Sequence, residues 1–172
     1  MSFATTSIHR ACTAQATIET PLGALLLART ERGLAGVWFD GQSDHPGPLA
    51  AAERPDDPLL QAAATQLADY FAGRSVSFDV PLDLHGTPFQ RSVWQALLGI
   101  AAGDTRSYGE IARQVGTADA VRAVGAAVGK NPLSVVVPCH RVIGSRGALT
   151  GYAGGLARKR ALLALEGVAL SS

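Results

Sequence analysis

The hydrophobic pattern of the chain changes near His85, and this change limits the folds that the chain can adopt. Before it, short apolar runs alternate with turns containing Pro and Gly, which is typical of β-strands. After it, apolar residues recur at helical spacing behind Ser or Thr caps. The 172 residues therefore predict an α/β (α+β) protein with a small N-terminal sheet domain, residues 1–82, and a mostly helical C-terminal domain, residues 83–172.

The N-terminal half is expected to contain three short strands and one helix, over residues 16–20, 23–28, 34–39 and 57–70. Residues 77–81 are a candidate for one more strand. The first ten or so residues carry no pattern and are expected to be loose. No set of residues in this half indicates catalysis.

Two capping boxes predict helices in the C-terminal half. Thr-Pro-Phe-Gln, residues 87–90, and Ser-Tyr-Gly-Glu, residues 107–110, place Gln or Glu three residues after the cap. The second box opens a short helix that Gly116 ends, and a third helix is expected over about residues 119–129. Two short helices joined at a glycine indicate a winged-helix-like helix-turn-helix. A strand over residues 135–137 and a last helix ending at Gly167 complete the half.

The third helix is expected to have one core face and one nearly bare face. Val121, Val124 and Val128 share the core face. The opposite face contains small and charged residues, namely Asp119, Arg122, Ala123, Ala126 and Lys130. Such a face fits a helix pressed into the DNA minor groove, where reading is nearly blind to sequence. A small-residue helix packed against another helix is an equal alternative.

Charge differs between the halves. Residues 1–82 hold five arginines and nine acidic residues, whereas residues 83–172 hold ten basic and five acidic residues. The asymmetry hints at nucleic acid as a partner of the second half, and a chance imbalance on a solvated surface explains it equally simply.

Only two cysteines, Cys12 and Cys139, occur in the chain, which argues against a disulfide framework. No signal peptide and no apolar run of roughly 20 residues is found, so a cytoplasmic protein without a membrane partner is expected. His9, Cys12 and His85 leave a structural metal open, but a fourth ligand is lacking. We therefore expect neither a metal nor a cofactor.

Cys139 follows three valines and a proline and precedes His140. A thiolate is the nucleophile, so some group must take the proton of a thiol whose usual pKa is about 8.5. Neighbours on an extended chain point to opposite sides, so a water is expected to bridge Cys139 and His140. Glu166, at the unfavourable end of the last helix dipole, could orient the imidazole. The alternatives are a buried structural thiol and an ordinary surface glutamate.

Six motifs in this order resemble the O6-alkylguanine-DNA alkyltransferases, also called methylated-DNA–protein-cysteine methyltransferases. Over residues 86–167 they are GTPFQRSVW, SYGEIA, AVRAVGAAVGKNP, VVVPCHRVIG, GYAGG and RKRALLALEG. The N-terminal half resembles the family only loosely, at TPLGALLLA and LADYFAG, where the family has a sheet domain of ribonuclease-H-like shape. The resemblance implies a monomer that repairs double-stranded DNA without an obligate protein partner.

The resemblance also implies the chemistry. Cys139 would take the alkyl group of O6-alkylguanine, and also of O4-alkylthymine, irreversibly and once. His140, through a water, and Glu166 would assist the ionisation of Cys139. Asn131 would tie the third helix to the active-site strand.

Roles in DNA binding and base recognition follow from the same resemblance. Tyr108 would press on the target phosphate and donate to the flipped base, and Arg122 would replace that base in the stack. Ala123, Ala126 and Lys130 would complete the DNA-binding face. The base pocket would be formed by Val142, Tyr152, Ala153, Gly154 and Gly155, with Lys159 near its rim. Some relatives have a hydroxyl residue where this chain has Ala153.

Two other interpretations use only part of these features. A cysteine hydrolase could use a Cys–His–Glu set, but it would need an oxyanion hole and would not need Arg122. A non-catalytic helix-turn-helix protein that binds lesions or regulates transcription would need the third helix but no poised thiol. Alkyl transfer from DNA is the interpretation that uses both.

Overall fold

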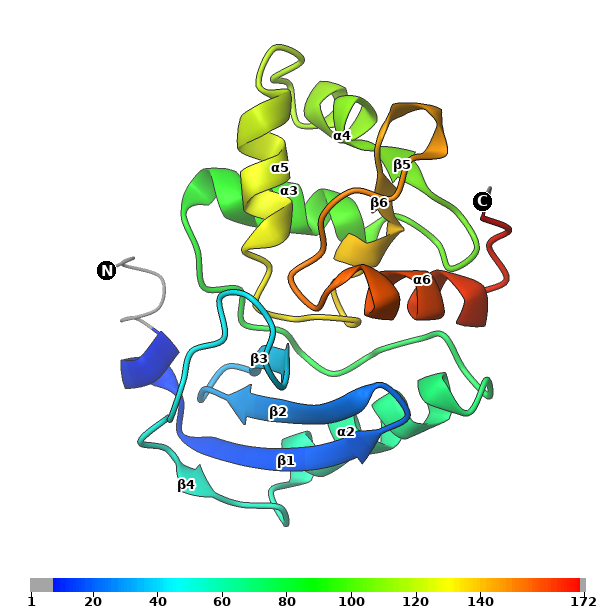
Figure 1. Cartoon of the computed structure of the whole chain (residues 1–172). Coiled ribbons are helices and arrows are strands. Elements are labelled where there is room, and N and C mark those ends of the chain that lie inside the picture. The colour runs from blue at the N-terminus through cyan, green and yellow to red at the C-terminus, as the bar shows by residue number, and fades with distance from the viewer. Residues whose placement is uncertain (1–7, 171–172) are drawn as a thin grey trace. The chain divides into compact units, whose positions relative to one another are not determined.

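The computed structural model describes residues 8–170, and these divide after His85 into two compact units. Figure 1 shows a sheet with a long helix beside it in the first unit and a group of helices in the second. Within the described residues, no helix combines the length and apolar composition that a bilayer crossing requires.

The first unit is a four-stranded sheet with the strand order β3-β2-β1-β4. Its strands are β1 (Ala14–Thr20), β2 (Gly23–Arg29), β3 (Leu34–Phe39) and β4 (Ala52–Glu53). The first three run antiparallel in sequence order, and β4 pairs parallel to β1. Gly23 pairs with Thr20 at a tight turn, where its φ of 115° requires glycine.

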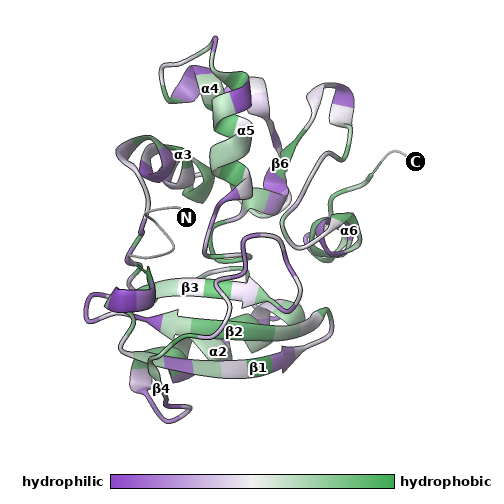
Figure 2. Ribbon diagram, turned by 60° about the vertical axis from the view of Figure 1, so that its left-hand side comes forward, coloured by the Kyte–Doolittle hydropathy of each residue, from purple (hydrophilic) through white to green (hydrophobic). Residues whose placement is uncertain are grey.

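Helix α2 (Pro58–Phe71) packs against β1, β2 and β3. Asp57 caps it, with its carboxylate accepting from the amide of Leu60 over 3.0 Å. Figure 2 colours most of β2 hydrophobic, and every residue of β3 is buried. The core of this unit therefore lies around β2 and β3.

Two expectations for this unit are wrong. Residues 8–11 form a helical turn, and Ile8 and Cys12 are buried against Trp38, so the chain is not loose from residue 8 onward; residues 1–7 lie outside the described part. Residues 77–81 do not form a strand. Leu34 makes a single bridge with Leu82 there, because Pro81 has no amide hydrogen for a ladder.

The second unit is built on four helices and a two-stranded parallel ladder. The helices are α3 (Pro88–Leu98), α4 (Tyr108–Gln114), α5 (Val121–Gly129) and α6 (Leu156–Leu165), and the strands are β5 (Arg106–Ser107) and β6 (Val142–Ile143). Helices α3, α4 and α5 contact one another, and Nε1 of Trp94 donates to the carbonyl of Ala127 over 2.8 Å. The α4–α5 pair forms the helix-turn-helix expected from the sequence.

Both capping boxes form as predicted. The amide of Gln90 donates to Oγ1 of Thr87 over 3.1 Å, and the amide of Glu110 donates to Oγ of Ser107 over 3.1 Å. In each box the second side chain returns a bond to the cap amide. The starts of α3 and α4 are therefore fixed by local sequence.

Three details of the second unit differ from expectation. Residues 135–137 form a buried turn instead of a strand, with Val135 at a φ of 73°. The amide of Val137 bonds back to the carbonyl of Leu133 over 2.9 Å, which prevents an extended ladder. Helix α5 begins at Val121, two residues later than expected, and Val121 is 40% exposed, so it does not belong to the core face.

Candidate active site

Cys139 opens a single 3-10 turn, η1 (Cys139–Arg141), directly after Pro138. All three residues of the turn are buried, and Cys139 is 4% exposed. Cys139 and His140 therefore do not alternate along an extended strand, as was expected, since the chain is helical there. Both residues belong to one buried turn.

Asn131 closes the turn that leads to Cys139. Its Nδ2 donates to the carbonyl of Val137 over 2.8 Å, and its Oδ1 accepts from the amide of Leu133 over 2.9 Å. Asn131 follows α5, whose C-terminal cap is Lys130. The side chain thus links the end of the third helix to a turn, where a strand was expected.

Glu166, the cap residue after α6, lies among charged and polar partners and is fully buried. Its Oε2 lies 2.8 Å from Nε2 of His140. Arg141 donates to both carboxylate oxygens, from Nε to Oε1 and from Nη2 to Oε2, each over 2.8 Å. Nη1 of Arg141 donates to the carbonyl of Ile100 over 2.6 Å.

Arg141 is a site residue that sequence reasoning missed. A bidentate arginine neutralises Glu166, which removes the need for a protonated imidazole to offset the helix dipole. The signal was an arginine inside a run of valine, proline and cysteine, where a buried charge requires a partner. An acidic partner elsewhere in the second half could have been sought on that ground.

Burial and the hydrogen bond to Glu166 determine the protonation state of His140. Burial is the largest effect and lowers its pKa, so the imidazole is neutral at neutral pH. The Glu166 carboxylate only accepts, so Nε2 carries the hydrogen and Nδ1 is an acceptor. Nδ1 is buried, and no described residue is hydrogen-bonded to it. A proton acceptor is therefore oriented within one turn of the thiol.

The pKa of Cys139 is raised, chiefly by burial. Three groups lower this pKa by favouring the thiolate. They are the side chain of Asn131, the charge of Lys159 and the hydroxyl of Tyr152. The resting thiol is thus protonated, with three groups placed to stabilise the anion once it forms.

Lys159 does not lie at a pocket rim, as the resemblance implied, because its side chain is fully buried. Its Nζ donates to the carbonyls of Val142, Thr150 and Gly151 over 2.6, 2.9 and 3.5 Å. Burial lowers its pKa to about 8, and the nearby Cys139 opposes this shift. A lysine that donates to three carbonyls holds the loop between β6 and α6 in place.

The other expected pocket residues lie on or beside this loop. Val142 is buried, and Tyr152, Ala153 and Gly154 are half-buried. Gly155 is exposed and caps α6 with a φ of 92°, a conformation that favours glycine.

The bare face of α5 is exposed as the sequence predicts. Its exposed residues, with those flanking the helix, are Asp119, Arg122, Ala123, Ala126 and Lys130. Tyr108 is half-buried at the start of α4. A Cβ placed on Gly125 of α5 would lie 3.8 Å from the Tyr108 ring, so that ring packs on the helix.

The possible metal ligands are not brought together. Within residues 8–170, no three His, Cys, Asp or Glu side chains form a group that could hold a metal. Nε2 of His9 bonds the carbonyl of Pro46, and Nε2 of His85 bonds Asp83, each over 2.8 Å. Burial raises the pKa of Cys12 to about 11, so this thiol is inert.

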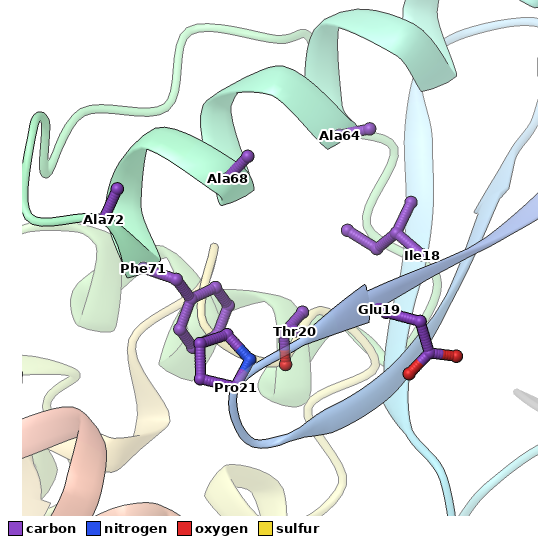
Figure 3. Close-up of a pocket in the computed structure, with 8 residues that line it drawn as sticks. All are labelled: Ile18, Glu19, Thr20, Pro21, Ala64, Ala68, Phe71 and Ala72. Atoms are coloured by element: carbon purple, nitrogen blue, oxygen red, sulfur yellow. The ribbon is translucent and has the colours of Figure 1, made fainter.

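An apolar pocket in the first unit lies between β1 and α2 (Figure 3). Its lining residues are Ile18, Glu19, Thr20, Pro21, Ala64, Ala68, Phe71 and Ala72. Figure 3 shows the Glu19 carboxylate pointing away from the Phe71 ring. The lining of this pocket includes no thiol and no imidazole.

Known proteins match the chain over nearly its whole length. The DNA binding domain of 6-O-methylguanine DNA methyltransferase matches residues 88–168, and the ribonuclease-like domain of the same proteins matches residues 14–84. The methylated-DNA–protein-cysteine methyltransferase of Mycobacterium tuberculosis is 52% identical over 150 residues, which cover 87% of this chain and 90% of the relative. The chain belongs to the 6-O-methylguanine DNA methyltransferase family.

A second relative and a solved structure support the same family. The Methanosarcina acetivorans methylated-DNA–protein-cysteine methyltransferase is 50% identical over 153 residues, covering 88% of this chain and 97% of the relative. The crystal structure of a Mycobacterium tuberculosis member in complex with DNA is 49% identical, with a TM-score of 0.83 over 90% of this chain and 92% of that chain. The predicted family and fold class are confirmed.

Proposed function

We propose that Cys139 is the alkyl acceptor in the direct repair of O6-alkylguanine in DNA, the reaction that family membership gives this chain. The observation that carries the proposal is the unpartnered, buried Nδ1 of His140, whose ring is fixed through Nε2 by Glu166 and Arg141. A neutral imidazole with one open acceptor nitrogen is suited to take a proton from a neighbouring thiol, through one water.

The transfer consumes the thiol. A bond forms between Sγ of Cys139 and the alkyl carbon, while the bond from that carbon to guanine O6 breaks. The electron pair of the broken bond returns to the guanine. The thiol proton passes first to His140 and then, through solvent, to the guanine ring, which leaves neutral guanine and a neutral imidazole. A thioether is a poor leaving group, so each molecule acts once.

Burial of Cys139 has a function in this scheme. The raised pKa keeps the thiol protonated until a lesion is bound, which limits oxidation and unwanted alkylation. Asn131 and the charge of Lys159 then stabilise the thiolate as it forms. The hydroxyl of Tyr152 also lowers the pKa of the thiol.

DNA binding is assigned to the bare face of α5. A chemical group inside a duplex is out of reach, so the base must be flipped out, at a cost of a few kcal/mol. Arg122 is placed to enter the stack, while Ala123 and Ala126 allow the helix backbone to approach the minor groove and Lys130 contacts phosphate. The monomer binds double-stranded DNA in this way.

The flipped base would enter a pocket of Val142, Tyr152, Ala153, Gly154 and Gly155. Tyr108 would contact the target phosphate and donate to the base. Ala153 offers O6 only its backbone amide, because it has no side-chain hydroxyl. We propose that O4-alkylthymine is accepted too, since its alkyl oxygen has a comparable position on the ring.

The alternative, a non-catalytic lesion-binding or regulatory protein, is not favoured. The curated relatives are named as cysteine methyltransferases, and Cys139 is present with its acid, its arginine and its histidine. A protein that only binds lesions or regulates transcription does not require a cysteine beside a histidine that is oriented by an acid.

The test is intact mass after mixing the protein with one equivalent of duplex containing O6-methylguanine. One added methylene, mapped to a peptide containing Cys139, together with plain guanine in the DNA, is the expected result. Cys139→Ser is the control and should bind DNA without gaining mass, whereas Cys12→Ser should react normally. Binding of the unaltered protein without any mass change would refute alkyl transfer.

A further inference from the structure

The hydroxyl of Thr150 bonds Tyr108 across the second unit. Oγ1 of Thr150 lies 3.3 Å from Oη of Tyr108 and donates to it, although the two residues are 42 positions apart. Thr150 is on the loop that leads from β6 to α6, and Tyr108 is the first residue of α4. The bond therefore joins the expected base-pocket loop to the helix-turn-helix.

Thr150 is held in place by more than this bond. Its carbonyl accepts from the buried Nζ of Lys159 over 2.9 Å. Its methyl group, Cγ2, packs over Gly144, where an added Cβ would lie only 3.2 Å away. The backbone and the methyl are thus fixed on two sides, which directs the hydroxyl toward Tyr108.

The Tyr108 ring lies against Gly125 of α5, where an added Cβ would be 3.8 Å from a ring carbon. Rotation about the C–O bond of the phenol decides where its hydroxyl hydrogen points. A tyrosine hydroxyl has one hydrogen to donate and can accept as well. When Thr150 donates to the oxygen, the hydrogen of Tyr108 is left for another acceptor.

We propose that Thr150 is a positioning residue that orients the Tyr108 hydroxyl for donation to the alkylated base. The inference rests on the proposed function, in which Tyr108 donates to the flipped base. As the bond from the alkyl carbon to O6 breaks, negative charge develops on the guanine ring, and an oriented donor stabilises that charge. Thr150 acts on the base only through Tyr108.

The experiment measures the single-turnover rate constant of methyl transfer to Cys139 from duplex DNA containing O6-methylguanine. Four variants are compared with the unaltered protein: Thr150→Val, Thr150→Ser, Tyr108→Phe and the double variant Thr150→Val with Tyr108→Phe. Val keeps the shape and removes the hydroxyl, whereas Ser keeps the hydroxyl. Thr105→Val is a matched control outside the loop. Thermal unfolding and binding to unmodified duplex are measured for each variant.

Thr150→Val should slow transfer roughly three- to tenfold, the range expected for one hydrogen bond, with unchanged DNA binding and unfolding temperature. Thr150→Ser should restore the rate. In the Tyr108→Phe background, Thr150→Val should have no further effect, because the group that it orients is gone.

Three results would overturn the inference. These are an equal loss in both backgrounds, an unchanged rate in Thr150→Val, and a faster rate in Thr150→Val, which would mean that Tyr108 donates to Thr150. Failure of the unaltered protein to transfer would instead remove the proposed function, and this inference with it.

Discussion

Arg141 donates to both carboxylate oxygens of Glu166, and His140 contacts one of the same oxygens. One buried acid thus serves two neighbouring residues of the 3-10 turn. The arginine balances the charge of the carboxylate, while burial is the largest effect that keeps the histidine neutral. In the proposed reaction, charge compensation and proton acceptance therefore belong to different residues.

Arg141→Met should lower the free energy of unfolding by about 3–5 kcal/mol, because it leaves the charge of Glu166 buried without its partner. Chemical denaturation followed by circular dichroism measures the loss. Arg146→Met, at an exposed loop position, is the control and should change little. The double variant Arg141→Met with Glu166→Gln should recover part of the loss. A loss below about 1 kcal/mol in the single variant, as for exposed pairs, would contradict the compensation.

His140 should make stability depend on pH. Its pKa in the folded protein is below the ordinary value of about 6.5. Below that pH, the imidazole is therefore protonated more readily in the unfolded chain than in the folded protein. The contribution is complete above about pH 6.5 and is lost as the pH falls, by up to ~1.4 kcal/mol per pH unit. Denaturation midpoints between about pH 7 and pH 5 should therefore fall less steeply in His140→Gln than in the unaltered protein. His45→Gln, in the first unit, should leave the slope unchanged, and equal slopes for all three proteins would refute the assignment.

Arg122→Ala should slow repair of O6-methylguanine in duplex DNA by about ten- to a hundredfold, if the side chain supplies 1.4–2.8 kcal/mol toward flipping. Reaction with free O6-benzylguanine, which needs no flipping, should be nearly unchanged. Parallel rate measurements on the two substrates separate these effects. Arg160→Ala, on the exposed surface of α6, is the matched control. Equal losses on both substrates would assign Arg122 to the alkyl-transfer chemistry instead.

Lys159→Met should loosen the loop between β6 and α6, because three carbonyls lose their common donor. Leaving the buried carbonyl of Val142 unsatisfied should cost about 1–3 kcal/mol of stability, and alkyl transfer should slow as well. Hydrogen exchange should rise in residues 142–151 and not in α3. Arg160→Met, one residue further along α6, should change none of the three: stability, the rate of alkyl transfer or hydrogen exchange. If hydrogen exchange in residues 142–151 does not change, the hydrogen bonds of the loop's own backbone are enough to hold it, and Lys159 is not needed for this.

Local signals predicted the parts of this fold that local interactions build. The capping boxes at Thr87 and Ser107 define helix starts within four residues, so α3 and α4 followed from the sequence. The third helix was expected at nearly its observed place, although its exposed first residue, Val121, was assigned to the core.

Errors occurred where side-chain hydrogen bonds to the backbone or to other side chains decide the local structure. Three consecutive valines suggested a strand, but side-chain bonds from Asn131 and a left-handed Val135 fold that segment into a turn. The family resemblance placed Lys159 at a pocket rim, whereas its side chain is buried and donates to three carbonyls of the preceding loop. Arg141 was missed because its partner is 25 residues away.

The position of Glu166 also bears on synthesis of the protein on the ribosome. The acid follows α6, so it is the last made of the residues that surround the thiol. A growing chain contains Cys139, His140 and Arg141 before their carboxylate exists. Because N-terminal segments emerge first, the nascent chain holds Cys139, His140 and Arg141 without this carboxylate until the end of α6 has been translated.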